Sequence, residues 1–434
     1  MNPQDTVTEA VPRMKLPDRS QVDPNPKRLD DLIPPDHKAR MVWLLVEQLD
    51  ITPLYAGIKA VEGHAGRPPV DPRILVALWL YATDESVASA RELGRLCYEC
   101  DPYKWLRGGV DVHYHTLSDF RTAHADWLKE QIVTNIAVMR AEGLVNLDVI
   151  GQDGMKVRAS AGNDSFKREE ALQRLLEEAE QRWDRLQREF EQETGLSARQ
   201  QAAQKRSARE RVERLKQALE EVKKVAEARE RRKKGDGASA RASTTDPEAR
   251  RMKMGDGGTR PAYNVELATE LNSLVIVGAD LINVGSDAGQ MEPMVQQIES
   301  EQGPLPEGSE YQVDGNFVTM EDLESVGQRG VTVFAPPKEV ERQKRQGKDP
   351  YAPKPGDTPK VAEWRQRMGT PEAKERYKQR GKCEWSNAEC RNRGLQQFLV
   401  RGLEKVKAVV LWYVLVHNLF RWVALRAELA KAAA

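Results

Sequence analysis

Apolar residues recur at helical spacing between residues 37 and 145. Met41 and Leu44 predict one amphipathic helix, because residues three or four apart share a helix face. The dipeptide Asp71-Pro72 predicts the start of another helix, since Asp caps helix N-termini and Pro is tolerated in the first turn. This part of the chain is therefore expected to be helical.

Two further short helices are predicted to begin near Ser89 and near Thr116. Asp119 follows Thr116 by three positions, which resembles a capping box. Several short helices separated by polar turns are compatible with a helix-turn-helix DNA-binding module. They are equally compatible with an ordinary helical bundle, and the pattern alone leaves both interpretations open.

The pattern changes at residue 147, where a short apolar strand is predicted to end in Gly-Gln-Asp153-Gly154. A long charged stretch, 166–234, then carries leucines at helical spacing. The break at 194–197 predicts an antiparallel helical hairpin, with Ser197 as the N-cap of its second arm. A Gly-, Ser- and Asp-rich link of residues 235–258 follows.

Strands and helices alternate after this link. The pattern predicts strands at 263–268, 274–284, 311–313 and 331–335, helices at 287–300 and from about 373 onward, and little regular structure at 336–360. With the insertions removed, the centre reads as a mixed α/β layer.

These elements predict three regions. They are a flexible leader (1–36), a helical, helix-turn-helix-like DNA-binding domain (37–145) and an α/β domain (146–434) that the hairpin and link (164–258) interrupt.

The charge balance excludes a globally basic protein. The 434-residue chain has 67 basic and 67 acidic residues, so any DNA-binding face must be a local patch. The second arm of the predicted hairpin is the more basic of its two arms. That arm is interpreted either as a solvated face or as a clamp on a phosphate backbone.

Other residue patterns argue for a soluble intracellular protein without a membrane span. Four scattered cysteines do not make a disulfide framework. The N-terminus lacks a signal segment, and the apolar run 408–416 is far shorter than the roughly 20 residues of a span. His417 is expected to be a core histidine. A zinc site would need a firmer frame than the following residues offer: Cys97, Cys100, His113 and His115.

Two aspartates are the first candidates for chemistry. Asp153 and Asp314 each follow a predicted strand and precede a glycine, which permits a tight turn. Strand ends in an α/β sheet point into a shared crevice, where two carboxylates could bridge metals about 3.5–4 Å apart. Such hard oxygen ligands favour Mg²⁺ or Mn²⁺. Asp-Gly is also a common turn dipeptide, and this alternative stays open.

A third acid comes from a predicted helix. Tyr377, Arg380, Glu384 and Arg391 are 3, 4 and 7 positions apart, which places them on one helical face. The arginines could hold DNA oxygens while Glu384 completes a metal site. The alternative is a surface helix with an Arg380–Glu384 ion pair. Asp280 and Asp287 are further candidates for the acidic site, and Asp287 is equally suited to capping a helix.

The same four residues resemble the tyrosine, arginine, glutamate and lysine (YREK) signature of bacterial insertion-sequence DDE transposases. The resemblance is closest to the insertion-sequence 1182-like branch and extends in order over roughly residues 35–425. It is supported by the segments 153–159, 246–252, 263–265, 314–317, 393–395, 401–406 and 417–419. Arg391 replaces the signature lysine, and Glu389 is the nearest competitor for the place of Glu384.

The resemblance implies a ribonuclease H-like core with aspartates on its first and fourth strands and a glutamate on a later helix. It implies catalysis by Asp153, Asp314 and Glu384, which would bind Mg²⁺ or Mn²⁺. DNA contacts are expected from Lys156, Tyr377, Arg380 and Arg391.

The implied reaction is hydrolysis at transposon ends followed by attack of the freed 3′-hydroxyl on target DNA. The partners would be double-stranded DNA, as terminal inverted repeats and target, and further copies of the chain in a homodimer or larger assembly. The expected location is the bacterial cytoplasm, near the nucleoid. Two alternatives are a catalytically inactive DNA-binding regulator derived from a transposase and a plain ribonuclease H-like nuclease.

Overall fold

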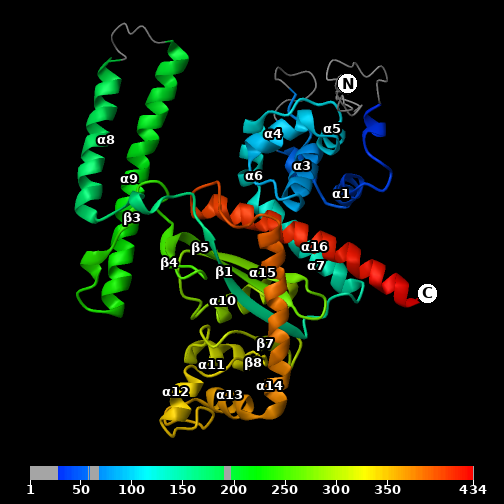
Figure 1. Ribbon diagram of the computed structural model, residues 1–434, viewed down its shortest axis with the longest axis vertical. Coiled ribbons are helices and arrows are strands. Elements are labelled where there is room, and N and C mark those ends of the chain that lie inside the picture. The colour runs from blue at the N-terminus through cyan, green and yellow to red at the C-terminus, as the bar shows by residue number, and fades with distance from the viewer. Residues whose placement is uncertain (1–27, 57, 59–67, 190–196, 434) are drawn as a thin grey trace, which may run out of the picture.

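The computed structural model describes residues 28–56, 58, 68–189 and 197–433. Most of the expected leader (1–36) and the predicted hairpin turn at 194–196 therefore lie outside the described residues. Within the described part, a cluster of N-terminal helices, a central sheet, a projecting helical hairpin and a C-terminal group of helices can be followed in Figure 1.

The N-terminal region is helical, as predicted. The helix α3 begins after the cap Asp71, and α4 begins after Ser89, which confirms both predicted starts. The predicted start at Thr116 is wrong, because His113 caps α6 by accepting a hydrogen bond from the backbone of His115. The elements are η1 (Leu29–Leu32), α1 (Lys38–Glu47), α2 (Thr52–Ala56), α3 (Pro72–Asp84), α4 (Ala90–Glu99), α5 (Asp101–Arg107), α6 (Tyr114–Ala123) and α7 (Ala125–Ala141).

The central sheet has the strand order β6-β5-β1-β7-β8, with β4 also paired to β5. The strands β5 and β6 run antiparallel to their neighbours, whereas β7 and β8 continue parallel to β1. The chain is thus a mixed α/β protein with a helical N-terminal region. The bounds are β1 (Val149–Arg158), β4 (Arg250–Lys253), β5 (Thr259–Glu270), β6 (Ile276–Ile282), β7 (Glu310–Gln312) and β8 (Thr332–Phe334).

The strand β1 is longer than its apolar pattern predicts. Because β5 pairs with it from Ile150 to Arg158, the strand runs through Asp153 and Gly154. The expectation that Asp153 directly follows a strand end is therefore wrong: it lies in the middle of β1. Asp314 does follow a strand, two positions after β7.

Different helices cover the two faces of the sheet. On one face, Asp153 contacts Asn387 of α15 (Cys383–Asn392). On the other, Gln152 donates to the carbonyl of Gln290, just before α10 (Met291–Gln302). Successive β1 side chains thus alternate between α15 and α10, as strand geometry requires. The helix α11 (Met320–Gln328) packs beside α10.

The predicted hairpin is present and has its own apolar core. Its arms α8 (Glu169–Glu189) and α9 (Ala198–Arg232) pack through a cluster that includes Leu172 and Leu215. Ser197 caps α9 in a capping box with Gln200, which confirms the predicted cap. The short elements η2 (Asn163–Ser165), β2 (Phe166–Lys167), η3 (Gly237–Ser239) and β3 (Ala242–Ser243) join the hairpin to the sheet.

The C-terminal third is more helical than predicted. A short helix, α12 (Val340–Arg345), lies in the stretch expected to be irregular, and α13 (Pro359–Gly369) begins before residue 373. After it come α14 (Pro371–Tyr377), η4 (Lys378–Lys382) and α15, which continue one another in Figure 1.

The final helix, α16 (Leu403–Ala433), is the central core helix. It packs against α3, α6, α7 and β6, so one apolar core joins the N-terminal helices to the sheet. By length and apolar composition this helix could cross a membrane, yet 72% of its most apolar segment is buried inside the protein. Its His417 lies 2.8 Å from the carbonyl oxygen of Leu274 and is buried, which confirms the predicted core histidine.

Candidate active site

Asp153 and Asp314 come from adjacent parallel strands. The last paired residues of β1 and β7 are Gly151 and Gln312, and each aspartate lies two positions further along its chain. Residues opposite each other in a parallel pair point to the same face. Asp153 continues along β1, whereas Asp314 lies beyond the paired residues of β7 and accepts a hydrogen bond from the backbone N–H of Asn316 (3.0 Å).

Asp153 is held by two side chains from the helical stretch above it. Arg380 Nη2 donates to Asp153 Oδ1 (2.9 Å), and Asn387 Nδ2 donates to Oδ2 (2.8 Å). Burial raises the pKa of Asp153, with smaller upward contributions from the charges of Glu384 and Asp287, although Arg380 and Asn387 act in the opposite direction. Asp153 is thus a partly desolvated carboxylate balanced by one guanidinium.

Glu384 shares that guanidinium. Arg380 Nη1 donates to Glu384 Oε1 (3.2 Å), and the Glu384 side chain is 64% exposed. The competitor Glu389 instead pairs with Arg393 (3.0 Å). Glu384 is therefore the acid of this helix that lies next to Asp153, and Arg380 lies between the two carboxylates.

Tyr377 supports the strand that precedes Asp314. Its hydroxyl donates to the carbonyl of Val313 (3.2 Å), and burial raises its pKa to about 12. Burial lowers the pKa of the Arg380 guanidinium. The charges of Asp153 and of other neighbours, including Asp314, raise it overall. The helical stretch thus brings Arg380 onto Asp153 and Tyr377 onto Val313, the residue before Asp314.

A second polar cluster, which the sequence pattern did not reveal, lies on the opposite face of β1. Glu266 of β5 is fully buried, and accepts from Gln152 (3.1 Å) and Asn264 (2.7 Å). Asn264 also donates to Asp287 (2.7 Å). Burial and the charge of Asp287 raise the pKa of Glu266 to about 8. The available signal in the sequence was the pair Asn264 and Glu266, which alternate with apolar residues along the predicted strand.

Asp287 and Asp280 have different environments. Asp287 pairs with Lys156 (3.3 Å) and approaches Gly154, whereas α10 has Gln290 as its cap, so the helix-cap interpretation of Asp287 is wrong. Asp280 lies opposite Glu266 on β6, and its side chain pairs with Lys407 of α16 (2.9 Å).

A basic cavity of about 660 Å³ opens beside Gly154. Lys156 and Arg391 line it, so two of the residues predicted to contact DNA face the same space. The Arg391 guanidinium has no partner among the described residues. The cavity lies next to the strand that carries Asp153, and its lining is suited to an anionic group.

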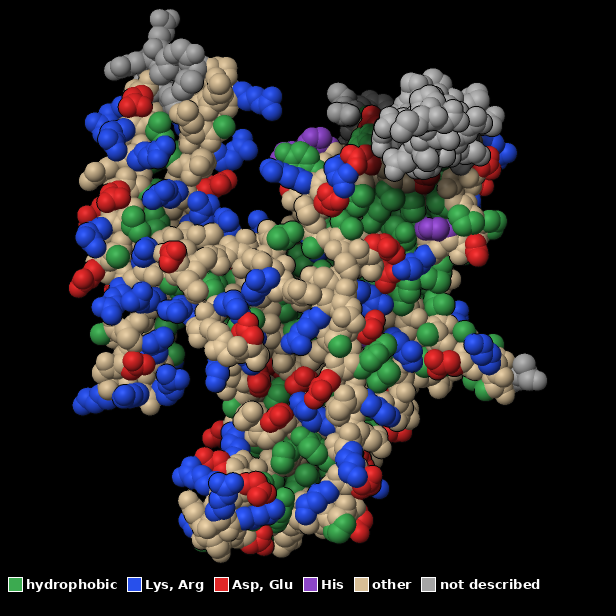
Figure 2. All heavy atoms as spheres, in the orientation of Figure 1, with side chains coloured by type: hydrophobic (Ala, Val, Ile, Leu, Met, Phe, Trp, Pro, Cys, Tyr) green, Lys and Arg blue, Asp and Glu red, His purple; other side chains and the backbone are tan. Residues whose placement is uncertain are grey.

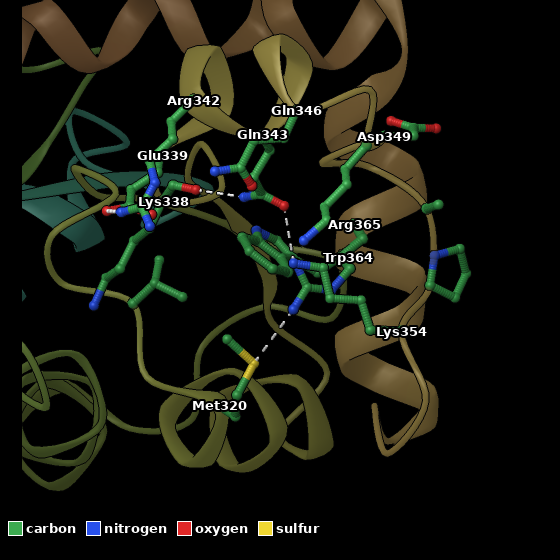
Figure 3. Close-up of a pocket in the computed structure, with 14 residues that line it drawn as sticks. Met320, Lys338, Glu339, Arg342, Gln343, Gln346, Asp349, Lys354, Trp364 and Arg365 are labelled. Atoms are coloured by element: carbon green, nitrogen blue, oxygen red, sulfur yellow. Dashed lines mark hydrogen bonds and ion pairs between the residues drawn. The ribbon is translucent and has the colours of Figure 1, made fainter.

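A larger cavity, of about 740 Å³, lies between α12 and α13, and none of the three acids lines it (Figure 3). Gln343 links its walls by donating to the carbonyl of Lys338 (2.7 Å) and accepting from Lys354 (3.0 Å). Arg365 is held by Asp357 (2.7 Å). These polar side chains are already paired with one another, so size alone does not make this cavity the active site.

Two family models match the chain. Residues 27–123 match a family described as a transposase domain (DUF772), and residues 352–423 match a transposase DDE domain. Both descriptions name a transposase, and together the two matches cover less than half of the chain. DDE transposases act on DNA and typically use divalent metal ions. No curated protein and no solved structure matches the chain.

The second match contains part of the site. Tyr377, Arg380 and Glu384 lie inside the matched DDE segment, whereas Asp153 and Asp314 lie outside it. The geometry described above is what joins the two aspartates to that segment.

Proposed function

We propose that this transposase cleaves DNA at transposon ends and transfers the freed strand into target DNA, with Asp153, Asp314 and Glu384 as its catalytic acids. One observation carries the proposal: Arg380 bonds to both Asp153 and Glu384, and the charge of Asp314 also raises its pKa. Asp153 and Glu384 thereby share one half-buried cation, and the charge of Asp314 also raises the pKa of that cation.

The sheet topology supports a ribonuclease H-like core. Without the short strands of the insertion, the core strands in chain order are β1, β5, β6, β7 and β8. Asp153 then lies on the first strand and Asp314 follows the fourth, as the resemblance implies. The spacing of Tyr377, Arg380, Glu384 and Arg391 supports a YREK-type signature and the insertion-sequence 1182-like branch.

The donor chemistry fits Mg²⁺ or Mn²⁺, because carboxylate oxygens are the ligands that these ions prefer. Within the part of the chain that the structure describes, no three carboxylate, imidazole or thiol groups are close enough to hold an ion. Arg380 occupies the space between Asp153 and Glu384. Asp153 and Asp314 would hold the ion, and Glu384 would complete the site once it separates from Arg380.

A divalent ion at this site supplies activation of the attacking oxygen and charge stabilisation of the leaving one. The residues of the chain position the DNA. Lys156 and Arg391 are placed in the basic cavity to hold phosphate oxygens, and Arg380 balances the charge of Asp153. Tyr377 fixes Val313 and thereby the position of Asp314.

The wider arrangement extends the same proposal. Residues 37–145 would bind DNA as a helix-turn-helix-like domain, with 1–36 as a leader and 146–434 as the catalytic domain. The enzyme would act as a dimer or larger assembly on terminal inverted repeats, in the bacterial cytoplasm close to the nucleoid.

Single alanine substitutions test the three acids. Asp153→Ala and Asp314→Ala are expected to lower end cleavage with Mg²⁺ by at least about a hundredfold, because each removes a metal ligand. Glu384→Ala is expected to do the same, and Glu389→Ala is the matched control on the same helix. Cleavage is measured on supercoiled plasmid carrying the element. Full cleavage by Asp153→Ala or Asp314→Ala would contradict the proposal, and loss in Glu389→Ala alone would reassign the third acid.

A further inference from the structure

The basic cavity beside Gly154 is continuous with a second one at the base of the hairpin. The second cavity, of about 540 Å³, shares Gly285 and Ser286 with the first. It lies between the end of α9, the link and β4, and arginines dominate its polar lining: Arg229, Arg232, Arg241, Arg250 and Arg251.

Five exposed cations in these two cavities have no side-chain hydrogen bond or ion pair with any described residue. They come from separate elements: the link before β3, the strand β4, the segment after β8 and the end of α15. We call them the basic strip: Arg241, Arg251, Lys253, Lys338 and Arg391.

The strand β4 explains two of these positions. Met252 is buried and Arg250 turns inward to pair with Glu221, so the alternating residues Arg251 and Lys253 face outward. The one acid in the lining of either cavity, Asp287, is already paired with Lys156. The strip therefore carries uncompensated positive charge over an extended concave surface.

The hairpin arm differs in this respect. Several cations along α9 are paired with acids, as in Arg209–Glu213 (2.9 Å) and Lys216–Glu180 (3.0 Å), and those that have no partner among the described residues, such as Arg206, Arg211 and Lys223, line neither cavity. Figure 2 shows acidic and basic side chains intermixed along the hairpin. The unpaired cations of the arm thus lie on the exposed surface of one helix, whereas those of the basic strip line two adjoining cavities.

We propose that the basic strip binds the phosphate backbone of the DNA duplex that continues beyond the cleaved bond, leading it from the acids to the base of the hairpin. The proposal rests on the proposed function, because the strip begins in the cavity beside the strand of Asp153. Unpaired cations distributed over two adjoining cavities match a polyanion with regularly spaced charges rather than one small anion. The contacts are made to phosphates, so binding through them is independent of sequence.

The test compares two triple variants that remove equal charge. The strip variant is Arg241→Gln, Arg251→Gln and Lys253→Gln, which avoids every residue assigned to the active site. The arm variant is Arg206→Gln, Arg211→Gln and Lys223→Gln, all exposed positions on α9. The full-length protein is titrated with a fluorescein-labelled duplex oligonucleotide of arbitrary sequence, and anisotropy is recorded over a range of NaCl concentrations.

The strip variant is expected to bind about tenfold more weakly at low salt, with a slope of log Kd against log salt that is shallower by about 2–3, because three phosphate contacts are lost. The arm variant should change affinity by about twofold or less. Restoring the charge with Arg241→Lys, Arg251→Lys and Lys253→Arg should recover most of the slope.

An unchanged slope in the strip variant, or an equal loss in the arm variant, would overturn the proposal. Thermal unfolding followed by circular dichroism shows whether the triple variant is folded. If it is not, Arg251→Gln alone must reduce the slope by about 1. The binding results are independent of cleavage. An Asp153→Ala variant that still cleaves would refute the proposed function, whether or not the basic strip binds DNA.

Discussion

At the scale of single residues, Gly154 of the Asp153-Gly154 dipeptide lies in a strand and not in the expected turn. Asp-Gly suggested a tight turn, but Gly154 lies within β1 and pairs with Glu266. A Cβ atom there would lie 2.8 Å from oxygens of both Asp287 and Glu266. The glycine is needed because the second polar cluster approaches the strand closely.

Gly154→Ala is therefore expected to lower the free energy of unfolding by about 1–3 kcal/mol, since Glu266 is buried and held by neighbours and cannot move aside easily. Urea denaturation measures the change. The matched control is Gly162→Ala, where a Cβ would meet nothing within 4 Å. Equal stability of the two variants would show that the cluster rearranges at little cost.

At the scale of elements, the hairpin is an insertion with its own core that is tied to the sheet at its base. Glu221 of α9 forms an ion pair with Arg250 of β4, and both side chains are largely buried. Arg250 also donates to the backbone carbonyls of Pro247 and Glu248, which fixes the link. This contact sets where the hairpin leaves the sheet, and with it the wall of the second cavity.

Glu221→Ala should loosen this base by roughly 1–3 kcal/mol, because it leaves the Arg250 charge without its acidic partner in a partly buried site. Hydrogen exchange is expected to speed up in η3, β3 and the end of α9. The exposed neighbour Glu220 provides the control, as Glu220→Ala should leave these amides protected. Unchanged protection in Glu221→Ala would mean that the apolar hairpin core alone holds the base.

At the scale of the whole molecule, the sheet has a buried carboxyl that couples stability to pH. Burial and the charge of Asp287 raise the pKa of Glu266 from 4.5 to about 8. The folded protein therefore holds a proton that the unfolded chain releases. Stability from this group is fully present below about pH 4.5 and is lost as the pH rises toward about 8.

Glu266→Gln is expected to flatten the decline of the unfolding free energy between about pH 5 and pH 8, because glutamine keeps the polar contacts without a titrating proton. Urea unfolding across this range measures the slope. Asp256→Asn, at an exposed carboxylate paired with Arg260 (2.6 Å), is the comparison that should retain the slope of the parent protein. A full slope in Glu266→Gln would assign the pH dependence to other groups.

The sequence by itself determined the local elements and the order of the motifs. Caps such as Asp71 and Ser197 act within one turn, so their residue types were sufficient to predict helix starts. The spacing of Tyr377, Arg380 and Glu384 likewise predicted a helical stretch. The length of β1 could not be predicted in this way, because its second half is held by pairing with β5, more than a hundred residues later in the chain.

Only the tertiary structure decided which charges meet. The parallel pairing of β1 with β7 brings together the two strands that lead to Asp153 and Asp314, and the packing of η4 and α15 on the sheet brings Arg380 and Asn387 onto Asp153. The same folding buries Glu266 and leaves Arg251 unpaired, although both are ordinary charged residues of a strand. Burial and partners are set by long-range contacts, and these decide whether a charge is structural, catalytic or free to bind a ligand.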